Sequence, residues 1–374
     1  MLEILVLIKS SQTLIINHGL LLKIGKMKRF KYIALGLFSV LFLSCGGGNS
    51  ATSKLFNIQL EGNKAEFQQN QTIKIDLGNP KQKTINSVSY SIDGVELLPS
   101  DGKITLNLPT LGNKTLMAKV SYDEGMVDIS KSIKVLASNP PEIYTYEILN
   151  VYPHDIQAYT QGLEFHNDTL YESTGRRGQS SLRKVDYKSG RILKQIDLDK
   201  TFFGEGITIL NNKIYQLTWQ SRMGFIYSLD DFEKIDTFTY DQSREGWGLC
   251  NNGKKLLKSD GTEKIWNLNP GTLKEEGYIE TVTNKSIFNK TNELEYVNGK
   301  IYANVYLKES MMIIDAQSGA IEGVVNFGGL KEKVKQHSDL DVLNGVAYHS
   351  GRKTFFVTGK NWDKLFEVNI IKKQ

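Results

Sequence analysis

Short apolar runs alternate with polar residues along most of this chain, and turn residues separate them. From Lys54 to about Leu136 the alternation has period two, which predicts strands. The clearest runs are Thr72–Leu77, Val88–Ile92, Lys103–Leu108, Thr115–Val120 and Ile129–Val135. Because Gly, Asn, Asp and Pro turns separate them, residues 54–137 are predicted to form a small Ig-like β-sandwich. This region contains no His, Cys or Trp, so we expect a spacer or interaction module.

Two consecutive prolines, Pro140 and Pro141, mark the end of this region. Proline cannot donate to a strand ladder, and it stiffens the chain. We therefore predict a linker at 138–142 and a second domain at 143–374.

The second domain repeats one pattern, in which a polar or aromatic residue precedes an apolar run, a short turn and another apolar run. The residues that open each copy, here called the leading positions, are Gln161, Glu205, Trp247, Asn292 and Asn344. Their spacings are 44, 42, 45 and 52 residues. A period in the forties with several strands per unit is typical of a β-propeller. The fold class expected is thus all-β, a five-bladed β-propeller preceded by the sandwich. The strands at Tyr144–Asn150 and Leu365–Ile370 are expected to share a blade and close the ring.

The repeat also predicts a site, because equivalent positions of successive blades converge at one end of the central channel. The glycine and aliphatic residues after the leading positions are alike, whereas the leading residues differ. The second variable positions, 14 residues later, are Gly175, Trp219, Gly261 and Tyr306, with Gly359 and Lys360 in the last copy. One carboxylate, three carboxamides, a lysine and several aromatic rings on one frame indicate a pocket with an aromatic wall and few polar groups.

Each of these residues also has an ordinary structural interpretation. Trp219 and Trp247 suit blade packing, Glu205 suits a turn cap or a surface ion pair, and the asparagines suit turns. Their coincidence at one repeat position favours function. The roles of four further acids stay open: Glu164, Glu245, Glu293 and Glu295. His154 has no second His at metal-ligand spacing, and Cys250 lies in an apolar run without a nearby His, so we predict neither a metal site nor a thiol nucleophile.

Composition and charge narrow the possible partners. The net charge is +5, and the lysines are scattered, so nucleic-acid binding is not expected. Only two cysteines occur, Cys45 and Cys250, in contexts too different for a disulfide.

Residues 1–45 have the layout of a secretory signal that ends at a lipidated cysteine. Lys28 and Arg29 precede the apolar core Tyr32–Phe42, and small residues surround Cys45. Met27 is a candidate translation start, and 46–53 forms a tether. The apolar core is short for a membrane-spanning helix, although an uncleaved anchor is the alternative. Either interpretation predicts an exported protein, here lipid-anchored through Cys45 in the bacterial cell envelope, on the periplasmic side or the cell surface.

Eight motifs between residues 146 and 370 resemble, in unbroken order, the plant and bacterial type of glutaminyl-peptide cyclotransferase. They are Tyr159–Leu163, Tyr171–Gly175, Phe203–Gly206, Arg244–Leu249, Ser259–Gly261, Asn292–Tyr296, Ala303–Val305 and Leu343–Gly345, followed by Thr358–Lys360 and Trp362. Two departures are visible: Tyr159 stands where phenylalanine is usual, and Tyr306 where tryptophan is usual. Both keep an aromatic ring, which puts substrate preference in doubt more than activity.

The resemblance implies a five-bladed propeller that converts the amino-terminal glutamine of peptides or proteins to pyroglutamate with release of ammonia, without a metal or other cofactor. It implies Glu205 as general acid/base, Gln161, Asn292 and Lys360 as polar groups of the pocket, and Phe203, Trp219 and Trp247 as its wall. Lys360 or a carboxamide is expected to stabilise the oxyanion. Tyr159 and Tyr306 are expected to bind substrate at the matching positions.

Two other functions compete with this one. The first is a catalytically silent propeller lipoprotein that binds peptides or partners through the same aromatic ring. The second is a calcium-dependent lactonase-type propeller, which needs several carboxylates converging on the channel. The leading positions offer one carboxylate, and this disfavours the lactonase.

Overall fold

The computed structural model describes residues 55–373, and within them regular structure consists of strands and two short 3-10 helices. The all-β prediction is confirmed. The first region holds two sheets. Their elements are β1 (Asn57–Leu60), η1 (Glu61–Asn63), β2 (Glu66–Gln68), β3 (Thr72–Gly78), β4 (Ile85–Ile92), β5 (Val95–Leu97), β6 (Lys103–Thr105), β7 (Gly112–Tyr122) and β8 (Gly125–Leu136).

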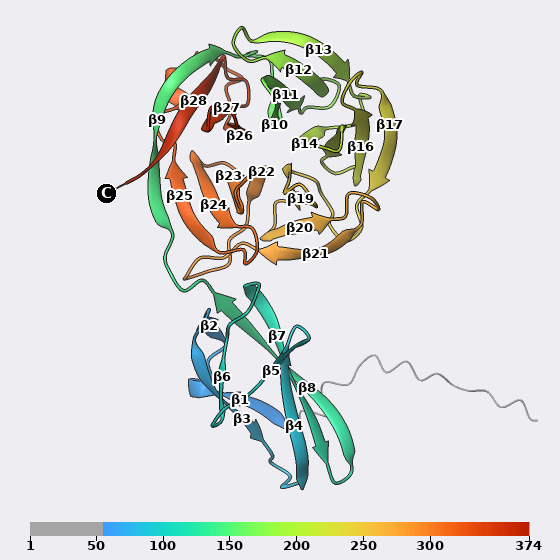
Figure 1. Ribbon diagram of the computed structural model, residues 1–374, viewed down its shortest axis with the longest axis vertical. Coiled ribbons are helices and arrows are strands. Elements are labelled where there is room, and N and C mark those ends of the chain that lie inside the picture. The colour runs from blue at the N-terminus through green and yellow to red at the C-terminus, as the bar shows by residue number, and fades with distance from the viewer. Residues whose placement is uncertain (1–54, 374) are drawn as a thin grey trace, which may run out of the picture. The chain divides into compact units, whose positions relative to one another are not determined.

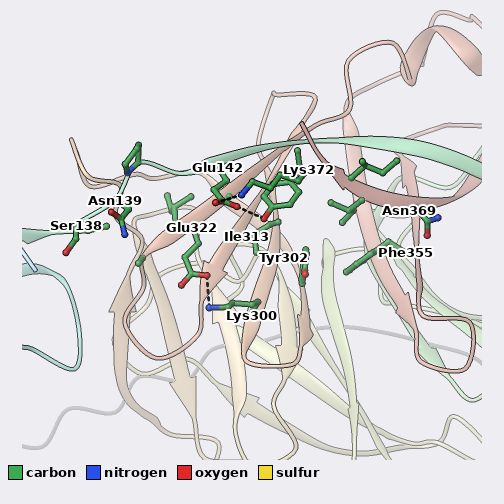
Figure 2. A pocket seen from close by; sticks show the side chains of 18 of the residues that line it. Ser138, Asn139, Glu142, Lys300, Tyr302, Ile313, Glu322, Phe355, Asn369 and Lys372 are labelled. Carbon is green, nitrogen blue, oxygen red and sulfur yellow. Dashed lines mark hydrogen bonds and ion pairs between the residues drawn. The ribbon is translucent and has the colours of Figure 1, made fainter. Parts of the chain in front are cut away.

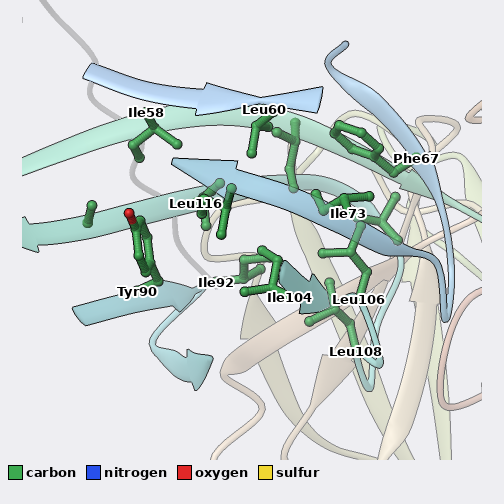
Figure 3. Close-up of a cluster of buried hydrophobic side chains, with 14 of the residues drawn as sticks. Ile58, Leu60, Phe67, Ile73, Tyr90, Ile92, Ile104, Leu106, Leu108 and Leu116 are labelled. Carbon is green, nitrogen blue, oxygen red and sulfur yellow. The ribbon is translucent and has the colours of Figure 1, made fainter. Parts of the chain in front are cut away.

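The two sheets of this region are β1-β3-β6 and β2-β8-β7-β4-β5. Alternate residues of their strands are buried, as in β7, and form one hydrophobic cluster (Figure 3). Ile73, Leu106 and Leu116 are fully buried in it. Period-two alternation predicts these strands because successive side chains of a strand point to opposite faces, so that alternate residues lie in the core. The Ig-like topology stays a prediction, as does the division into domains at 138–142.

The remaining strands form sheets arranged around a common centre (Figure 1). Three sheets have four strands each, in the order of the chain. They are β10 (Thr160–His166), β11 (Thr169–Thr174), β12 (Ser181–Asp186) and β13 (Arg191–Asp197); β14 (Gly204–Leu210), β15 (Lys213–Thr218), β16 (Met223–Ser228) and β17 (Lys234–Thr239); and β18 (Leu249–Asn251), β19 (Leu256–Ser259), β20 (Lys264–Leu268) and β21 (Glu275–Glu280).

A fourth sheet of eight strands completes the ring, in the order β22-β23-β24-β25-β9-β28-β27-β26. The η2 turn (Lys331–Lys333) lies between β25 and β26 in the sequence. The strands are β22 (Thr291–Val297), β23 (Lys300–Val305), β24 (Ser310–Asp315), β25 (Ile321–Asn326), β9 (Glu142–Pro153), β28 (Lys364–Lys372), β27 (Thr354–Gly359) and β26 (Leu343–His349).

Strand β9 joins the two halves of this eight-stranded sheet. Its first residues pair in parallel with β25, and most of its length pairs antiparallel with β28. The predicted pairing of the first and last strands of this region is therefore confirmed. Because the carboxyl-terminal strand is tied to the amino-terminal one, neither leaves an open sheet edge at this point.

Hairpin turns fix the register of the first two strands in each four-stranded group. Asn211 and Asn212, between β14 and β15, both have positive φ, as the favoured two-residue hairpin turn requires. The start of a first strand therefore lies beside the end of the second strand, as Gly204 pairs with Thr218. The leading positions and the residues 14 positions later consequently meet at one edge of the ring.

The five first strands, β10, β14, β18, β22 and β26, contact one another in sequence around the centre, and β26 contacts β10. Glycines permit this approach. A Cβ on Gly162 would lie 2.6 Å from Ile207 N, and one on Gly206 would lie 2.5 Å from Leu249 N. The glycines predicted as the shared frame are thus the places where one first strand packs directly on the next.

Cys45, the signal segment, Met27 and the tether lie outside the described residues. Among residues 55–373, no helix has the length and apolar content needed to cross a membrane.

We expect Gly206→Ala to lower the free energy of unfolding by about 1–3 kcal/mol, because the added methyl group overlaps backbone of β18. Denaturant unfolding measures this. Gly351→Ala is the matched control, since its nearest neighbour is a side-chain atom at 3.4 Å. Equal effects of the two substitutions would contradict the packing argument.

Candidate functional site

The polar residues predicted from the repeat lie together at one end of the ring's centre. Gln161, Glu205, Asn292 and Asn344 stand near the starts of β10, β14, β22 and β26, and Lys360 follows the end of β27. Each is at most 5% exposed. These five residues, here called the polar floor, are buried although all of them are polar, so their hydrogen bonds decide whether the arrangement is stable.

A directed chain of carboxamides runs across the polar floor. Asn292 Nδ2 donates to Asn344 Oδ1 at 2.9 Å, and Asn344 Nδ2 donates to Gln161 Oε1 at 3.0 Å. Gln161 Nε2 then donates to Glu205 Oε1 at 3.2 Å. Asn292 only donates in this chain, whereas Asn344 and Gln161 each accept from one neighbour and donate to the next, so the chain orients these carboxamides and directs one donor to the carboxylate.

Burial controls the ionisation of the two titratable groups of the floor. Desolvation raises the pKa of Glu205 well above its ordinary value; the charge of Lys360 opposes this rise, and that of Glu245 adds to it. Desolvation lowers the pKa of Lys360, while Glu205 and Asp341 oppose the change. The carboxyl group of Glu205 therefore keeps its proton to a higher pH than an exposed glutamate does.

Five aromatic residues form a half-buried wall around this floor: Tyr159, Phe203, Trp219, Trp247 and Tyr306. Phe203 lies edge-on to Tyr159 and to Trp219, with ring centroids 6.2 and 5.5 Å apart. Trp247 and Tyr306 form a second edge-on pair at 5.2 Å. All five were predicted as wall or substrate-binding residues, and the structure brings them together. The site thus combines buried polar groups with aromatic rings that are partly exposed to solvent.

Lys360 lies between two rings of this wall. Its Nζ is 4.8 Å from the ring centroid of Tyr159 and 5.8 Å from that of Tyr306. Tyr159 donates its hydroxyl to Asp341 Oδ2 at 2.8 Å, and Arg176 covers the same ring at 4.3 Å. Tyr159, which stands where phenylalanine is usual, therefore has a hydrogen-bond partner that phenylalanine could not have.

A family model described as glutamine cyclotransferase matches residues 117–370. The chain belongs to the glutamine cyclotransferase family. It is 38% identical over 234 residues to glutaminyl-peptide cyclotransferase of Arabidopsis thaliana, a match that covers 60% of this chain and 71% of that protein. The resemblance inferred from the motifs is confirmed.

A solved structure supports the same assignment. The crystal structure of Myxococcus xanthus glutaminyl cyclase is 33% identical, with a TM-score of 0.59, and the match covers 63% of this chain and 100% of that one. The glutamine cyclotransferase match begins within β7, earlier than the motifs indicated.

Two residues of this candidate site had been given no individual role from the sequence. Asn344 links two predicted floor residues, and its place at a leading position was the available signal. Glu245 had been left open. Its Oε2 accepts hydrogen bonds from the indoles of Trp219 and Trp247. Its only local signal is its place two residues before Trp247.

The other open acids lie together on the first strands, apart from the polar floor. Glu293 accepts hydrogen bonds from Leu163 N at 3.2 Å and Val346 N at 2.8 Å, and Glu164 accepts one from Ile209 N at 3.0 Å. Burial, followed by the charges of Glu164 and Glu293, raises the pKa of Glu295. These carboxylates connect neighbouring first strands of the ring. Sequence reasoning had weighed one carboxylate at the leading positions and left these three open.

No group of three or more His, Cys, Asp or Glu side chains within residues 55–373 could hold a metal ion. Cys250 is buried, and burial raises the pKa of its thiol well above the ordinary value. This agrees with a packed thiol rather than a nucleophile.

A surface cavity of about 1130 Å³ is lined by none of the predicted site residues (Figure 2). Its lining comes mainly from the segment before β9 and from β23, β25 and β28. Two ion pairs lie there, Lys372 with Glu142 and Lys300 with Glu322, each at 2.6 Å. Its lining lacks the buried carboxylate and carboxamides of the polar floor.

We expect the free energy of unfolding to fall as pH rises from about 4.5 to 8. Burial raises the pKa of Glu164 from 4.5 to about 8, so the folded protein holds a proton that the unfolded chain releases. That stabilisation is complete below the unfolded value and is lost as pH rises through the folded one. Glu164→Gln, which cannot ionise, should flatten the dependence in urea titrations at several pH values.

Exposed Glu96→Gln is the matched control for this experiment and should keep the slope of the unchanged protein. A Glu164→Gln protein whose stability falls with pH as steeply as that control would refute the assignment.

Proposed function

We propose that this protein is a glutaminyl-peptide cyclotransferase, which cyclises the amino-terminal glutamine of peptides or proteins to pyroglutamate and releases ammonia. The observation that carries the proposal is the environment of Glu205: a buried carboxylate with a raised pKa, hydrogen-bonded by an oriented carboxamide chain beneath a half-open aromatic wall. The family membership and the names of the two relatives support it.

Two proton transfers define what the site must do. The substrate's α-nitrogen has to lose a proton to attack its own γ-carbonyl carbon, and the γ-nitrogen has to gain one to leave as ammonia. We assign both transfers to Glu205, which accepts the first proton and delivers the second. A pKa raised by burial suits a carboxyl group that has to hold a proton before delivering it to the leaving nitrogen.

Stabilisation of the oxyanion is assigned to Lys360. Within the polar floor, each carboxamide already donates to another floor residue. Among residues 55–373, the ammonium of Lys360 donates no hydrogen bond and contacts only aromatic faces as a cation. Its N–H groups are thus available for the oxygen on which charge develops when the γ-carbonyl is attacked.

The aromatic wall positions the substrate and takes no part in proton transfer. A glutamine side chain must fold back so that its α-nitrogen and γ-carbon meet, and the five-membered ring is then favoured by proximity. Rings packed edge-on define the shape of the cavity that holds this folded conformer. Asn292 contributes a carboxamide oxygen that accepts no hydrogen bond from the described residues, and we assign it to the substrate's amine.

We infer a five-bladed propeller in which β22–β25 form the fourth blade and β26, β27, β28 and β9 the fifth, which the strand order supports. We propose that the reaction uses no metal, because the floor's donors are one carboxylate, three carboxamides and an amine, a poor set for a catalytic ion.

We propose that the protein is exported and anchored to the cell envelope by a lipid on Cys45, a residue outside the described part. The basic, apolar and small-residue order of the signal segment supports this. Labelling with a radioactive fatty acid would test the anchor, and labelling that persists in Cys45→Ser would refute it.

Glu205→Gln should lower kcat for ammonia release from a Gln-initiated dipeptide by about 10²–10⁴-fold, because the amide cannot accept and return a proton. Coupled ammonia detection in the presence of a chelator measures this. The control is Glu233→Gln, an exposed carboxylate in the turn before β17. Chelator-sensitive release would overturn the metal-free assignment, and peptide binding without release in the unchanged protein would favour the silent binding module.

Lys360→Met should lower kcat by about 10²-fold or more with a smaller change in KM, because the oxyanion exists only during the reaction. The methionine keeps the unbranched stem against Tyr159 and Tyr306. Steady-state kinetics with the same dipeptide separates the two parameters. An unchanged kcat would dismiss the assignment and leave a carboxamide as the oxyanion donor.

A further inference from the structure

One carboxylate oxygen holds two tryptophans of the wall at once. Trp219 Nε1 donates to Glu245 Oε2 at 2.7 Å, and Trp247 Nε1 donates to the same oxygen at 2.9 Å. Trp219 follows β15 and Trp247 precedes β18, so the two indoles belong to neighbouring sheets. Their orientations are therefore coupled through Glu245 across the boundary between these sheets.

The carboxylate of Glu245 is itself fixed in place. Gln220 Nε2 donates to its other oxygen at 3.2 Å, and the following amide, Gly246 N, donates to Trp219 O at 3.1 Å. A Cβ on Gly246 would lie 2.4 Å from the hydroxyl of Tyr240, so this turn packs closely on the sheet beneath. Glu245 thus has little freedom to leave the two indoles.

A buried ion pair anchors the same turn from below. Glu275 accepts hydrogen bonds from Gln242 N, Ser243 N and Ser243 Oγ at 2.6, 3.0 and 2.6 Å. Lys258 Nζ lies 2.7 Å from Glu275, and both side chains are almost fully buried. Such a network holds only one arrangement of the turn, because any other leaves buried charge unpaired.

The two indoles hold Glu245 differently from the way the floor holds Glu205. Glu245 is half-exposed and its Oε2 is occupied by two N–H donors, whereas Glu205 is buried and receives one carboxamide. A carboxylate that already accepts two indole hydrogens is poorly suited to take a proton from substrate. The negative charge of Glu245 nevertheless adds to the rise in the pKa of Glu205.

We propose that Glu245 is a positioning residue, which fixes the indoles of Trp219 and Trp247 so that the aromatic wall holds the substrate's amino terminus over Glu205. This inference rests on the proposed cyclotransferase function. The chemical reason is that indole faces attract an ammonium group, and only a fixed ring presents its face in a defined direction. The residue acts through the two tryptophans and through its charge.

Two substitutions separate these contributions. Glu245→Gln keeps an oxygen acceptor for the indoles and removes the charge, so KM should change less than about threefold. The limb of the pH profile that reports Glu205 should move to lower pH, because a charge that raises the pKa of Glu205 is gone. Glu245→Ala removes the acceptor as well, so KM should rise about tenfold or more.

A double-mutant cycle tests whether Glu245 acts through Trp219. Trp219→Phe lacks the N–H donor, so in that background Glu245→Ala should raise KM less than it does alone. Equal effects in both backgrounds would overturn the proposal. So would a Glu245→Gln protein that loses as much kcat as Glu205→Gln, since Glu245 would then be transferring protons.

A readout without catalysis keeps the inference separate from the proposed function. The indole N–H signals of Trp219 and Trp247, assigned in nitrogen-15 NMR spectra with Trp→Phe variants, should resist hydrogen exchange in the unchanged protein and in Glu245→Gln. In Glu245→Ala both should exchange faster, while circular dichroism confirms folding. Unaltered exchange in Glu245→Ala would refute the coupling even if the protein releases ammonia. Absence of ammonia release with altered exchange would refute only the cyclotransferase.

Discussion

Direct backbone contact between neighbouring first strands is the constraint on which the site depends. Four of the five strands carry a glycine immediately after the leading position: Gly162, Gly206, Gly248 and Gly345. Added Cβ atoms on Gly162, Gly206 and Gly248 would lie 2.6, 2.5 and 2.1 Å from backbone atoms of Ile207, Leu249 and Asn292, whereas one on Gly345 would lie 2.8 Å from the side chain of Leu163. Hydrogen bonds reinforce the approach, as Gly206 N donates to Trp247 O at 2.7 Å. The leading residues can form one floor because glycine at four of these positions lets the neighbouring first strands approach closely.

In the fourth copy of the repeat, a carboxylate and not a glycine contacts the other first strands. Glu293 stands where the others have glycine, and it accepts hydrogen bonds from backbone amides of β10 and β26. The ionisable side chain of Glu293 thus joins β22 to β10 and β26 by hydrogen bonds, where the other copies have a close contact at glycine. Burial raises the pKa of Glu293, against the effect of those two amides. The contacts that join β22 to β10 and β26 therefore depend on a buried carboxyl group whose pKa is shifted.

The polar floor and the aromatic wall of the site differ in their exposure to solvent. The carboxamides, Glu205 and Lys360 are buried, so their orientations are fixed by one another and their ionisation is shifted by desolvation. The aromatic rings of the wall are half-exposed. Glu245 connects the two layers, since its carboxylate orients two rings while its charge acts on the floor. Preorganised polar groups in a partly dry pocket are what proton transfer and charge stabilisation need.

The sequence by itself determined the strands, the turns and the place of the site. Period-two alternation and hairpin residues such as Asn211 and Asn212 gave an all-β fold, because these signals are local. The repeat brought Gln161, Glu205 and Asn292 to one edge, since equivalent positions in a ring converge. Tertiary structure decided the contacts between side chains: Asn344 bonds Gln161 across 183 residues of sequence, and Glu245 binds Trp219 from 26 residues away. Spacing along a chain sets which edge a residue reaches but not where its side chain points, and only packing against the neighbouring strands fixes that direction.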